Sequence, residues 1–317
     1  MIITVTMNPA IDKTVRSHSI LAGGLNRVED VVTDAGGKGI NVSKMIAALG
    51  GTSVATGFLG GGAGIEIERV LKNLGVQTDF VAVKHPTRTN LKVLSDDFGV
   101  TEFNEPGASV SPSEMDTLCQ KLYNHAKPGV IFVLAGSLPQ GVDTDIYQKL
   151  TVSLKQKGAL VFLDADSQAL GRAVEASPDL IKPNKFELAG YFGKGSELSL
   201  KECATLCREL TARGVGIVAL SMGAQGALFV TRGEMLYAPG LPVKALSTVG
   251  AGDSMVGAMA YALNMGNMDF RSAAKLAVAA SAGAVTTRGT TPPSRETVNK
   301  LLELVTFENG GLMGVTT

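Results

Sequence analysis

The stretch STVGAGDSMVG, residues 247–257, places three small residues, Gly250, Ala251 and Gly252, directly before the carboxylate of Asp253. From Met255 onward, apolar residues recur with the period of an α-helix, so we expect a helix that begins at this loop. The first turn of such a helix directs free N–H groups, and the positive end of the helix dipole, at whatever occupies the loop. Glycines allow an anion to approach this backbone closely. The stretch therefore predicts an anion site with a carboxylate at or near the helix N-cap.

Asp253 has two interpretations. Aspartate is a favoured N-cap residue, so a purely structural role is open. A carboxylate beside a phosphate cradle can instead take a proton from an attacking hydroxyl group, and an anion site with a base is the arrangement of a kinase. The other common nucleotide and hydrolase motifs are absent from the sequence: GxxxxGK[ST], GxGxxG, HExxH and GxSxG.

The composition indicates a large α/β protein. The chain has 317 residues, 45% of them hydrophobic, and 29 basic residues balance 29 acidic ones. This balance argues against a general nucleic-acid binder, which would carry a basic excess. Three cysteines without a CxxC pair suggest a reducing cytoplasm, and the short apolar N-terminus suggests a first strand rather than a signal peptide. The small-residue run 276–285 is too short to cross a bilayer. We therefore expect a cytoplasmic protein with no nucleic-acid or membrane partner.

Strand-like and helix-like segments alternate along the chain. Apolar, β-branched runs without polar alternation, typical of strands buried on both faces, occur at 2–5, 54–58, 130–134, 160–163, 217–220 and 227–230. Helical patterns occur at 42–49, 113–126, 143–157 and 199–213. This alternation predicts a mostly parallel sheet with helices on both sides.

Two segments, 11–33 and 82–107, are more polar, and the second contains a predicted hairpin with its turn at 96–99. We predict that they form a small β-sheet lid on a main α/β domain made of 1–10, 34–81 and 108–317. An open lid sheet with an apolar back face would allow a homodimer through the lid.

Three further stretches carry polar residues in suggestive positions. AGGKGINVSK (35–44) places Lys38 in a second glycine-rich loop before a helix, where a plain strand–helix connection is the alternative. In TRTNLKV (87–93), period two puts Arg88, Asn90 and Lys92 on one strand face, which is either solvated or turned toward a phosphosugar. In IKPNKFEL (181–188), Asn184 and Glu187 share a helix face and form either a capping box or a pair that organises Mg²⁺ through water. Asp164 and Asp166, at the end of a strand, are a weaker metal candidate.

Taken together, seven ordered motifs make the chain resemble the ribokinase-like sugar kinases of the PfkB family, from the first strand to the last helix. The motifs are NPAID (8–12), GGKGINV (36–42), TRTN (87–90), GSLPQG (136–141), KPNKFE (182–187), SMGAQGA (221–227) and STVGAGDS (247–254).

The resemblance implies a role for each matching residue. It implies that Asp253 is the catalytic base and that Gly250, Ala251 and Gly252 form its anion hole. The sugar-phosphate contacts that it implies are Asp12, Arg27, Gly37, Lys38, Asn41, Arg88, Asn90, Lys92 and Ser137. The nucleotide contacts are Lys182, Asn184, Ser221, Gly223, Gly226, Thr248 and Ala279, and the metal residues are Asn184 and Glu187.

The resemblance also implies the reaction. Within the family, Lys38, Lys92 and Arg27 are most similar to the phosphosugar branch that phosphorylates fructose 1-phosphate at its 6-hydroxyl, with ATP and Mg²⁺, to give fructose 1,6-bisphosphate. Kinases of tagatose 6-phosphate or fructose 6-phosphate are the alternatives on the same fold. A non-catalytic sugar-phosphate sensor is an alternative of another class, although a sensor has no need of a base at Asp253.

Overall fold

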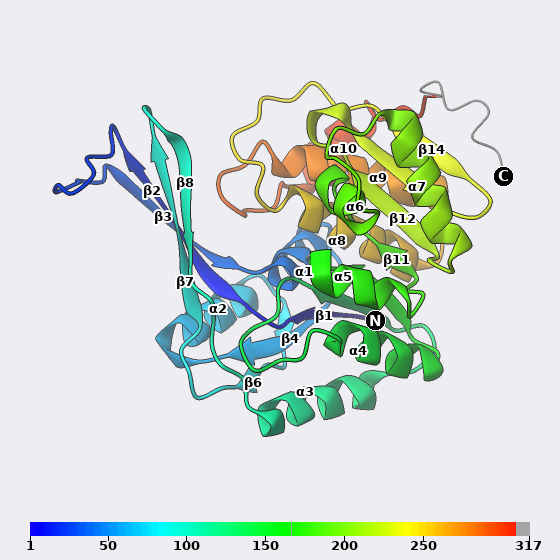
Figure 1. The fold of residues 1–317 in the computed structure, drawn as a ribbon, viewed down its shortest axis with the longest axis horizontal. Helices are drawn as coiled ribbons and strands as arrows, with labels where there is room; N and C mark the ends of the chain where they lie inside the picture. The colour runs from blue at the N-terminus through cyan, green and yellow to red at the C-terminus, as the bar shows by residue number, and fades with distance from the viewer. Residues whose placement is uncertain (166, 309–317) are drawn as a thin grey trace.

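The apolar strands pair into one sheet that carries helices on both faces (Figure 1). The computed structural model describes residues 1–165 and 167–308, so the candidate Asp166 lies outside the described residues. The strands run in the spatial order β14 (Met235–Ala238), β13 (Ala227–Val230), β12 (Ile217–Ser221), β11 (Leu180–Ile181), β10 (Leu160–Asp164), β9 (Ile131–Ala135), β1 (Ile2–Thr6), β4 (Val54–Leu59) and β5 (Gln77–Thr78), with β6 (Val81–Ala82) beside β4. The pairs are parallel except those that β13 makes, so the predicted mostly parallel sheet is confirmed.

The strand order reverses at β1. The chain continues from β1 to β4 on one side, and it later returns to β9 on the other side of β1. In open α/β sheets, ligands bind in the crevice beyond the carboxyl ends of the strands at such a switch point. The ends of β1, β9 and β10 are therefore the place to look for a site.

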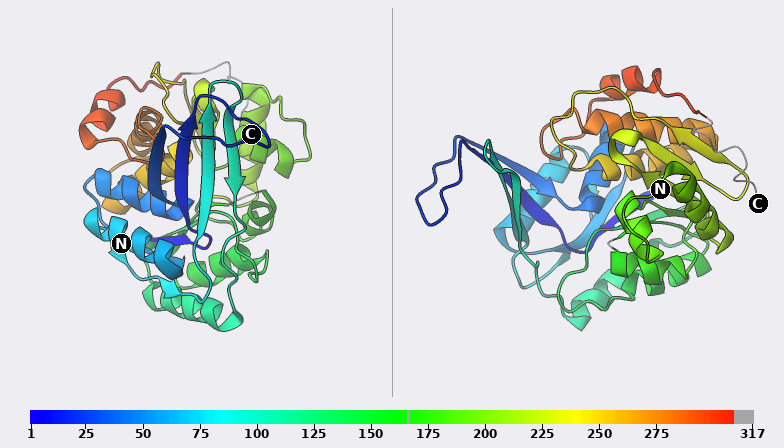
Figure 2. Two further views of the ribbon diagram at one scale, coloured as in Figure 1. Left: turned by 90° about the vertical axis from the view of Figure 1, so that its left-hand side faces the viewer. Right: turned by 45° about the horizontal axis from the view of Figure 1, so that its top comes forward.

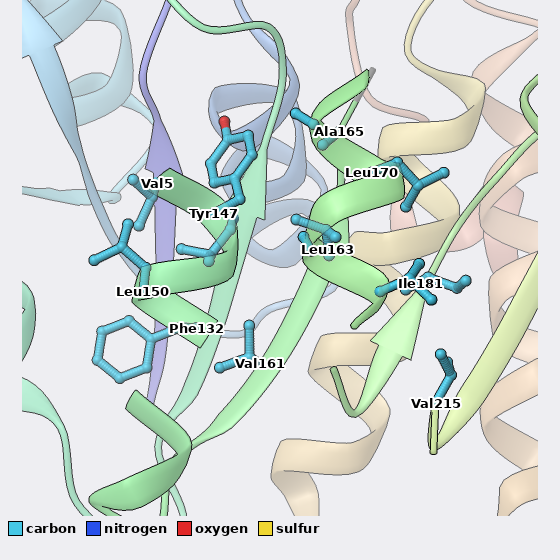
Figure 3. Close-up of a cluster of buried hydrophobic side chains, with 14 of the residues drawn as sticks. Val5, Phe132, Tyr147, Leu150, Val161, Leu163, Ala165, Leu170, Ile181 and Val215 are labelled. Carbon is cyan, nitrogen blue, oxygen red and sulfur yellow. The ribbon is translucent and has the colours of Figure 1, made fainter. Parts of the chain in front are cut away.

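Helices bury their apolar faces on both sides of this sheet. On one side lie α3 (Pro112–His125), α4 (Ile146–Gln156), α5 (Ser167–Val174), α6 (Lys185–Tyr191) and α7 (Leu200–Ala212). On the other lie α1 (Lys38–Ala48), α8 (Ala251–Met265), α9 (Phe270–Ala284) and α10 (Arg295–Leu302), and α2 (Gly61–Asn73) packs near β4 and β5. Figure 3 shows the first core, where Phe132 and Val161 from the sheet meet Leu150 of α4. None of the described helices is long and apolar enough to cross a membrane.

A second, smaller sheet stands away from this body (Figures 1 and 2). It contains β3 (Asp30–Gly36), β2 (Ala10–Ser17), β7 (Arg88–Ser95) and β8 (Gly99–Asn104), in that order. The predicted hairpin is present as the antiparallel pair β7–β8, which turns between Ser95 and Gly99. β2 follows β1 after three residues, so the second sheet is rooted at the switch point of the first.

Gly57, in β4, lies against the backbone of β1 at this switch point. Its φ of +135° is a conformation that L side chains rarely adopt, and a Cβ atom here would lie 1.9 Å from the carbonyl oxygen of Thr6. Glycine in a strand interior often marks such a close backbone approach. β1 and β4 can therefore lie this close together only because residue 57 is a glycine.

We predict that Gly57→Ala lowers the free energy of unfolding by more than about 1 kcal/mol, because both the backbone strain and the clash oppose the folded state. Gly62→Ala in α2 is the control. A Cβ there meets nothing within 4 Å and the φ angle is ordinary, so this helix substitution should not lower the free energy of unfolding and can raise it by up to about 1 kcal/mol. Urea unfolding of the two variants measures this, and equal stabilities would contradict the close approach.

Candidate active site

A cavity of about 290 Å³ lies between the second sheet and the ends of the central strands. It gathers residues from segments that are far apart in the sequence. The predicted residues that line it are Asp12, Gly37, Lys38, Asn41, Arg88, Asn90, Lys92, Ser137, Gly250 and Asp253. A neighbouring cavity of about 460 Å³ extends between the second sheet and the loops at 245–249 and 288–290, and it includes Thr248.

The helix that the opening stretch predicts is α8, and its N-cap is Gly250 rather than Asp253. Gly250 has a φ of 78°, the left-handed conformation that favours glycine. The N–H of Ser254 makes the first intrahelical bond, to Gly250, so the N–H groups of 251–253 have no acceptor within the helix. The interpretation of Asp253 as a cap is therefore wrong. Asp253 is the third residue of the helix, and its side chain points toward Asn41 of α1.

The carboxylate of Asp253 is buried and accepts a hydrogen bond from Asn41 of α1, with 2.8 Å between Nδ2 and Oδ2. Burial, with a smaller contribution from the nearby Asp164, raises the pKa of Asp253 from 3.8 to about 6. The Asn41 bond and the ammonium groups of Lys38 and Lys182 act in the opposite direction. The carboxylate is therefore ionised at neutral pH, with a pKa close enough to neutrality for it to accept a proton, which suits a general base.

Two ammonium groups share the buried carboxylate of Asp164 at the end of β10. The Oδ1 atom of Asp164 lies 3.0 Å from Nζ of Lys38 and 3.6 Å from Nζ of Lys182. A Cβ on Gly252 would lie 3.0 Å from Nζ of Lys182, so this lysine crosses close over the first turn of α8. The helix N-terminus and Lys182 place free N–H groups and positive charge side by side, a candidate anion site, and Asp164 is engaged by both lysines.

The glycines of the second loop let α1 approach β1. A Cβ on Gly37 would lie 2.6 Å from Cγ2 of Thr6, and one on Gly39 would lie 2.5 Å from Oγ1 of Thr6. Gly37 is also the N-cap of α1, with a φ of 115°. These glycines thus serve the strand–helix connection, and that connection brings Lys38 and Asn41 to the end of β1.

The polar face of β7 is turned toward the cavity. Asn90 donates to Oδ1 of Asp12 across the β2–β7 pair at 2.9 Å. Arg88 donates to two backbone carbonyls, of Glu105 at 2.8 Å and of Asn8 at 3.1 Å. The guanidinium is therefore held in one orientation at the edge of the cavity.

Five residues that line the cavity were not predicted as site residues: Asn8, Glu102, Asn104, Gly136 and Val249. Glu102 lies opposite Lys92 in the hairpin, and its Oε1 atom lies 3.5 Å from the lysine Nζ. The predicted hairpin could have indicated this cross-strand pair. The Asn8 amide donates to Oγ of Ser137 at 3.3 Å, and its only sequence signal is its place in NPAID.

The KPNKFE motif forms a capping box at the start of α6. Oδ1 of Asn184 accepts from the Glu187 N–H, and Oε2 of Glu187 accepts from the Asn184 N–H, each at 2.8 Å. Asn184 also bridges to Ser221 at the end of β12, so the two loops lie side by side. Gly226 must be glycine, since a Cβ there would lie 2.0 Å from the Ala238 carbonyl oxygen.

The remaining predicted residues lie outside both cavities. The nucleotide residues Lys182, Asn184, Ser221, Gly223 and Gly226 are placed near the anion site or around the ends of β11 and β12. Arg27 is exposed in the β2–β3 connection, and Ala279 is fully buried within α9. Neither residue lines a described cavity, so their ligand contacts stay predictions.

Comparison with known proteins places the chain among sugar kinases. The profile of the pfkB family carbohydrate kinases matches residues 2–297. The chain is 37% identical to a 1-phosphofructokinase of Rhodobacter capsulatus, covering 97% of both chains, and 38% identical to one of Bacillus subtilis, covering 81% of this chain and 83% of the other. Its structure is similar to phosphofructokinase-2 from Escherichia coli in complex with substrates and products, with a TM-score of 0.90, 31% identity, and coverage of 96% of this chain and 99% of the other.

The raised pKa of Asp253 has a consequence for stability. The folded state binds this proton more tightly than the unfolded chain, so ionisation of the group opposes folding. The penalty develops as the pH rises from about 4 to about 6 and remains at higher pH.

We predict that Asp253→Asn raises the free energy of unfolding at about pH 7.5 by an amount on the order of 2–3 kcal/mol and has little effect near pH 4. The amide keeps an oxygen that can accept from Asn41. Urea unfolding across this pH range measures the difference. Asp143→Asn, at an exposed site, should show no such pH-dependent gain. A variant less stable than the parent at neutral pH would mean that the bond to Asn41 outweighs the cost of burial.

Proposed function

The chain belongs to the pfkB family of carbohydrate kinases, and we propose that it transfers the γ-phosphoryl group of ATP to the 6-hydroxyl of fructose 1-phosphate, giving fructose 1,6-bisphosphate. The observation that carries this proposal is the buried carboxylate of Asp253 at the N-terminus of α8, beside Lys38 and Lys182 and facing the cationic strand β7. The substrate follows from the relatives named 1-phosphofructokinase that match nearly the whole chain.

In this proposal, Asp253 takes the proton of the 6-hydroxyl as the oxygen attacks phosphorus. The free N–H groups of Ala251 and Gly252 hold the oxygens of the transferring phosphoryl group, which gain charge in the transition state. Lys182 crosses the same turn and supports that charge. The groups are held in place by the fold, so little reorganisation is needed during the reaction.

The sugar phosphate would lie in the cavity under the second sheet. Arg88 and Lys38 carry the charges that suit its existing phosphate, and Lys92 contributes through its pair with Glu102. Asp12, Asn41, Asn90 and Ser137 are placed for the sugar hydroxyls.

The donor set of α6 fits Mg²⁺ bound together with a nucleotide. The capping box uses Oε2 of Glu187 and Oδ1 of Asn184, and a single carboxylate of this kind suits an ion that keeps most of its waters. The described residues contain no cluster of three or more His, Cys, Asp or Glu that could hold a metal alone. When bound, Mg²⁺ would neutralise phosphate charge. We propose that Glu187 and Asn184 orient its water shell, while Ser221, Gly223, Gly226 and Thr248 contact the nucleotide.

We also propose that two copies associate through the second sheet. The register places Val15 beside Val31 and Leu91 beside Phe103, on the face opposite Lys92 and Glu102. Val31 and Phe103 are exposed. This face also carries the exposed Lys13 beside Leu91, and its apolar residues suit a second copy of the same sheet.

Initial rates with fructose 1-phosphate, fructose 6-phosphate and tagatose 6-phosphate, each with Mg²⁺ and ATP, test the substrate. We expect kcat/KM to be highest for fructose 1-phosphate. Asp253→Asn is the matched control for the chemistry and should lower kcat by about 10²–10⁴ with a similar KM for ATP. Preference for another sugar phosphate would overturn the substrate, whereas ligand binding without turnover would favour a sensor.

We predict that Arg88→Ala lowers kcat/KM for the sugar phosphate by the equivalent of about 1.5–3 kcal/mol, the usual range for charged hydrogen bonds. Arg88→Lys should recover only part of this, because an ammonium cannot keep the bonds to both carbonyls and grip a phosphate through two parallel N–H groups. The KM for ATP should change little. A larger effect on ATP than on the sugar would remove Arg88 from the sugar-phosphate site.

A further inference from the structure

Lys44 is a buried lysine on α1 that has no part in the mechanism above. The residue is only 4% exposed. Its Nζ atom donates to the carbonyl oxygen of Ala35 at 2.9 Å, to Oδ1 of Asn41 at 3.2 Å and to Oγ1 of Thr290 at 2.8 Å. An ammonium group has three N–H bonds, so these acceptors use its full capacity.

The three acceptors come from three parts of the fold. Ala35 lies near the end of β3, at the root of the second sheet, and Asn41 lies in the first turn of α1. Thr290 follows α9, and a Cβ on Gly250, the N-cap of α8, would lie 3.8 Å from its Cα and Cβ atoms. Lys44 therefore joins the second sheet, α1 and the loop behind the anion site at one point.

The contact with Asn41 determines which way that amide points. Lys44 can only donate, so the oxygen of Asn41 must face Lys44 and the NH₂ group must face the other way. On that side lies the carboxylate of Asp253, which accepts from Nδ2 at 2.8 Å. If Asn41 turned over, its oxygen would face the carboxylate and the bond would become a repulsion.

The charges around Lys44 support its protonated form. The carboxylates that face it are those of Asp34, Asp12 and Asp253. Burial lowers the pKa of Lys44 from 10.5 to about 8, and these three carboxylates limit the change. At neutral pH the group is therefore a cation with three donors.

We propose that Lys44 is a positioning residue, which acts through Asn41 to hold the carboxylate of Asp253 in place and in its ionised form. The inference deepens the proposed function and rests on it, since that function makes Asp253 the base. It assigns to Lys44 no contact with substrate or nucleotide.

Steady-state kinetics of Lys44→Met provide the first test. We expect kcat to fall about 10–100-fold, because a small misplacement of the base is costly, while the KM for ATP stays within about twofold. The acid limb of the kcat–pH profile, expected near pH 6, should move to higher pH, because without Lys44 nothing holds the NH₂ group of Asn41 toward Asp253. Asp164, Lys38 and Lys182 also face Asp253 and are unchanged in this variant.

Matched variants separate positioning from simple loss of structure. Lys44→Arg keeps a cationic donor and should recover most of the kcat. Lys155→Met removes a lysine that binds Ser177 and Asp179 far from the cavity, and it should leave kcat and the pH profile unchanged. If Lys44→Met does not fold, Lys44→Arg tests the proposal in its place. A complete loss of kcat in a folded Lys44→Arg variant would count against the proposal.

A double-mutant cycle with Asn41→Ala tests whether Lys44 acts on Asp253 through Asn41. If Lys44 acts through Asn41, adding Lys44→Met to Asn41→Ala should change kcat and the acid limb little further. An equal further loss in this background would mean that Lys44 acts through its own charge or through the Thr290 loop, and would overturn the proposal. Thr290→Val removes one acceptor and leaves the Asn41 bond, so its kcat should stay within about threefold of the parent.

A final measurement does not depend on turnover. The stability difference between the parent and Asp253→Asn reports the pH at which Asp253 ionises in the folded state. Measured in the Lys44→Met background, this transition should move to higher pH. An unmoved transition would overturn the positioning role, whatever the activity shows. A moved transition in a protein that phosphorylates no sugar phosphate would uphold the role of Lys44 and reject the proposed function alone.

Discussion

The structure of the site depends on keeping buried charges neutralised. Within the centre of the molecule, the carboxylates of Asp12, Asp164 and Asp253 and the ammonium groups of Lys44 and Lys182 are each less than a tenth exposed. A single unpaired charge in such a place is strongly destabilising, so each group restrains where its neighbours can lie. The result is a set of side chains held rigidly before any ligand arrives. A preorganised polar environment of this kind is what phosphoryl transfer requires of a protein, since little covalent chemistry is left for it to do.

Close backbone packing makes this arrangement possible. Asn41 and Asp253 are separated by 212 residues in the chain and meet because α1 packs directly on α8. A Cβ on Gly257 of α8 would lie 3.0 Å from the Val42 carbonyl oxygen and from Cβ of Met45 on α1. Gly39 plays the same part between α1 and β1. Gly257 and Gly39 thus let α8 pack closely on α1 and α1 on β1, so that two helix N-termini converge on the same strand ends.

The site is divided between two bodies of structure. Asp253, the N-terminus of α8 and Lys38 belong to the main sheet and its helices, whereas Arg88, Asn90 and Lys92 belong to the second sheet. The larger cavity also lies between these parts and is bordered by Val32, Leu94 and Leu246. We infer that movement of the second sheet changes how closely the two sets of side chains approach, and that it controls the access of water to the reacting groups. Lys44 lies where this sheet joins the main body, and it donates both to Ala35 of the second sheet and to Thr290 of the main body.

Much of this protein could be predicted from the sequence because its signals are local. Strand and helix periodicity, the turn between Ser95 and Gly99, and the capping box of Asn184 and Glu187 depend on residues within a few positions of one another. The same reasoning placed Asp253 at the start of a helix beside an anion site. It could not show whether Asp253 caps the helix, because that depends on what lies across from the side chain. The bond from Asn41, the sharing of Asp164 by Lys38 and Lys182, and the burial of Lys44 and Ala279 became visible only in the tertiary structure. These features join residues from distant segments. No local pattern determines which polar groups are buried together. The packing of α1, α8 and the strand ends determines it, and the polar groups that lose water there must bond to one another.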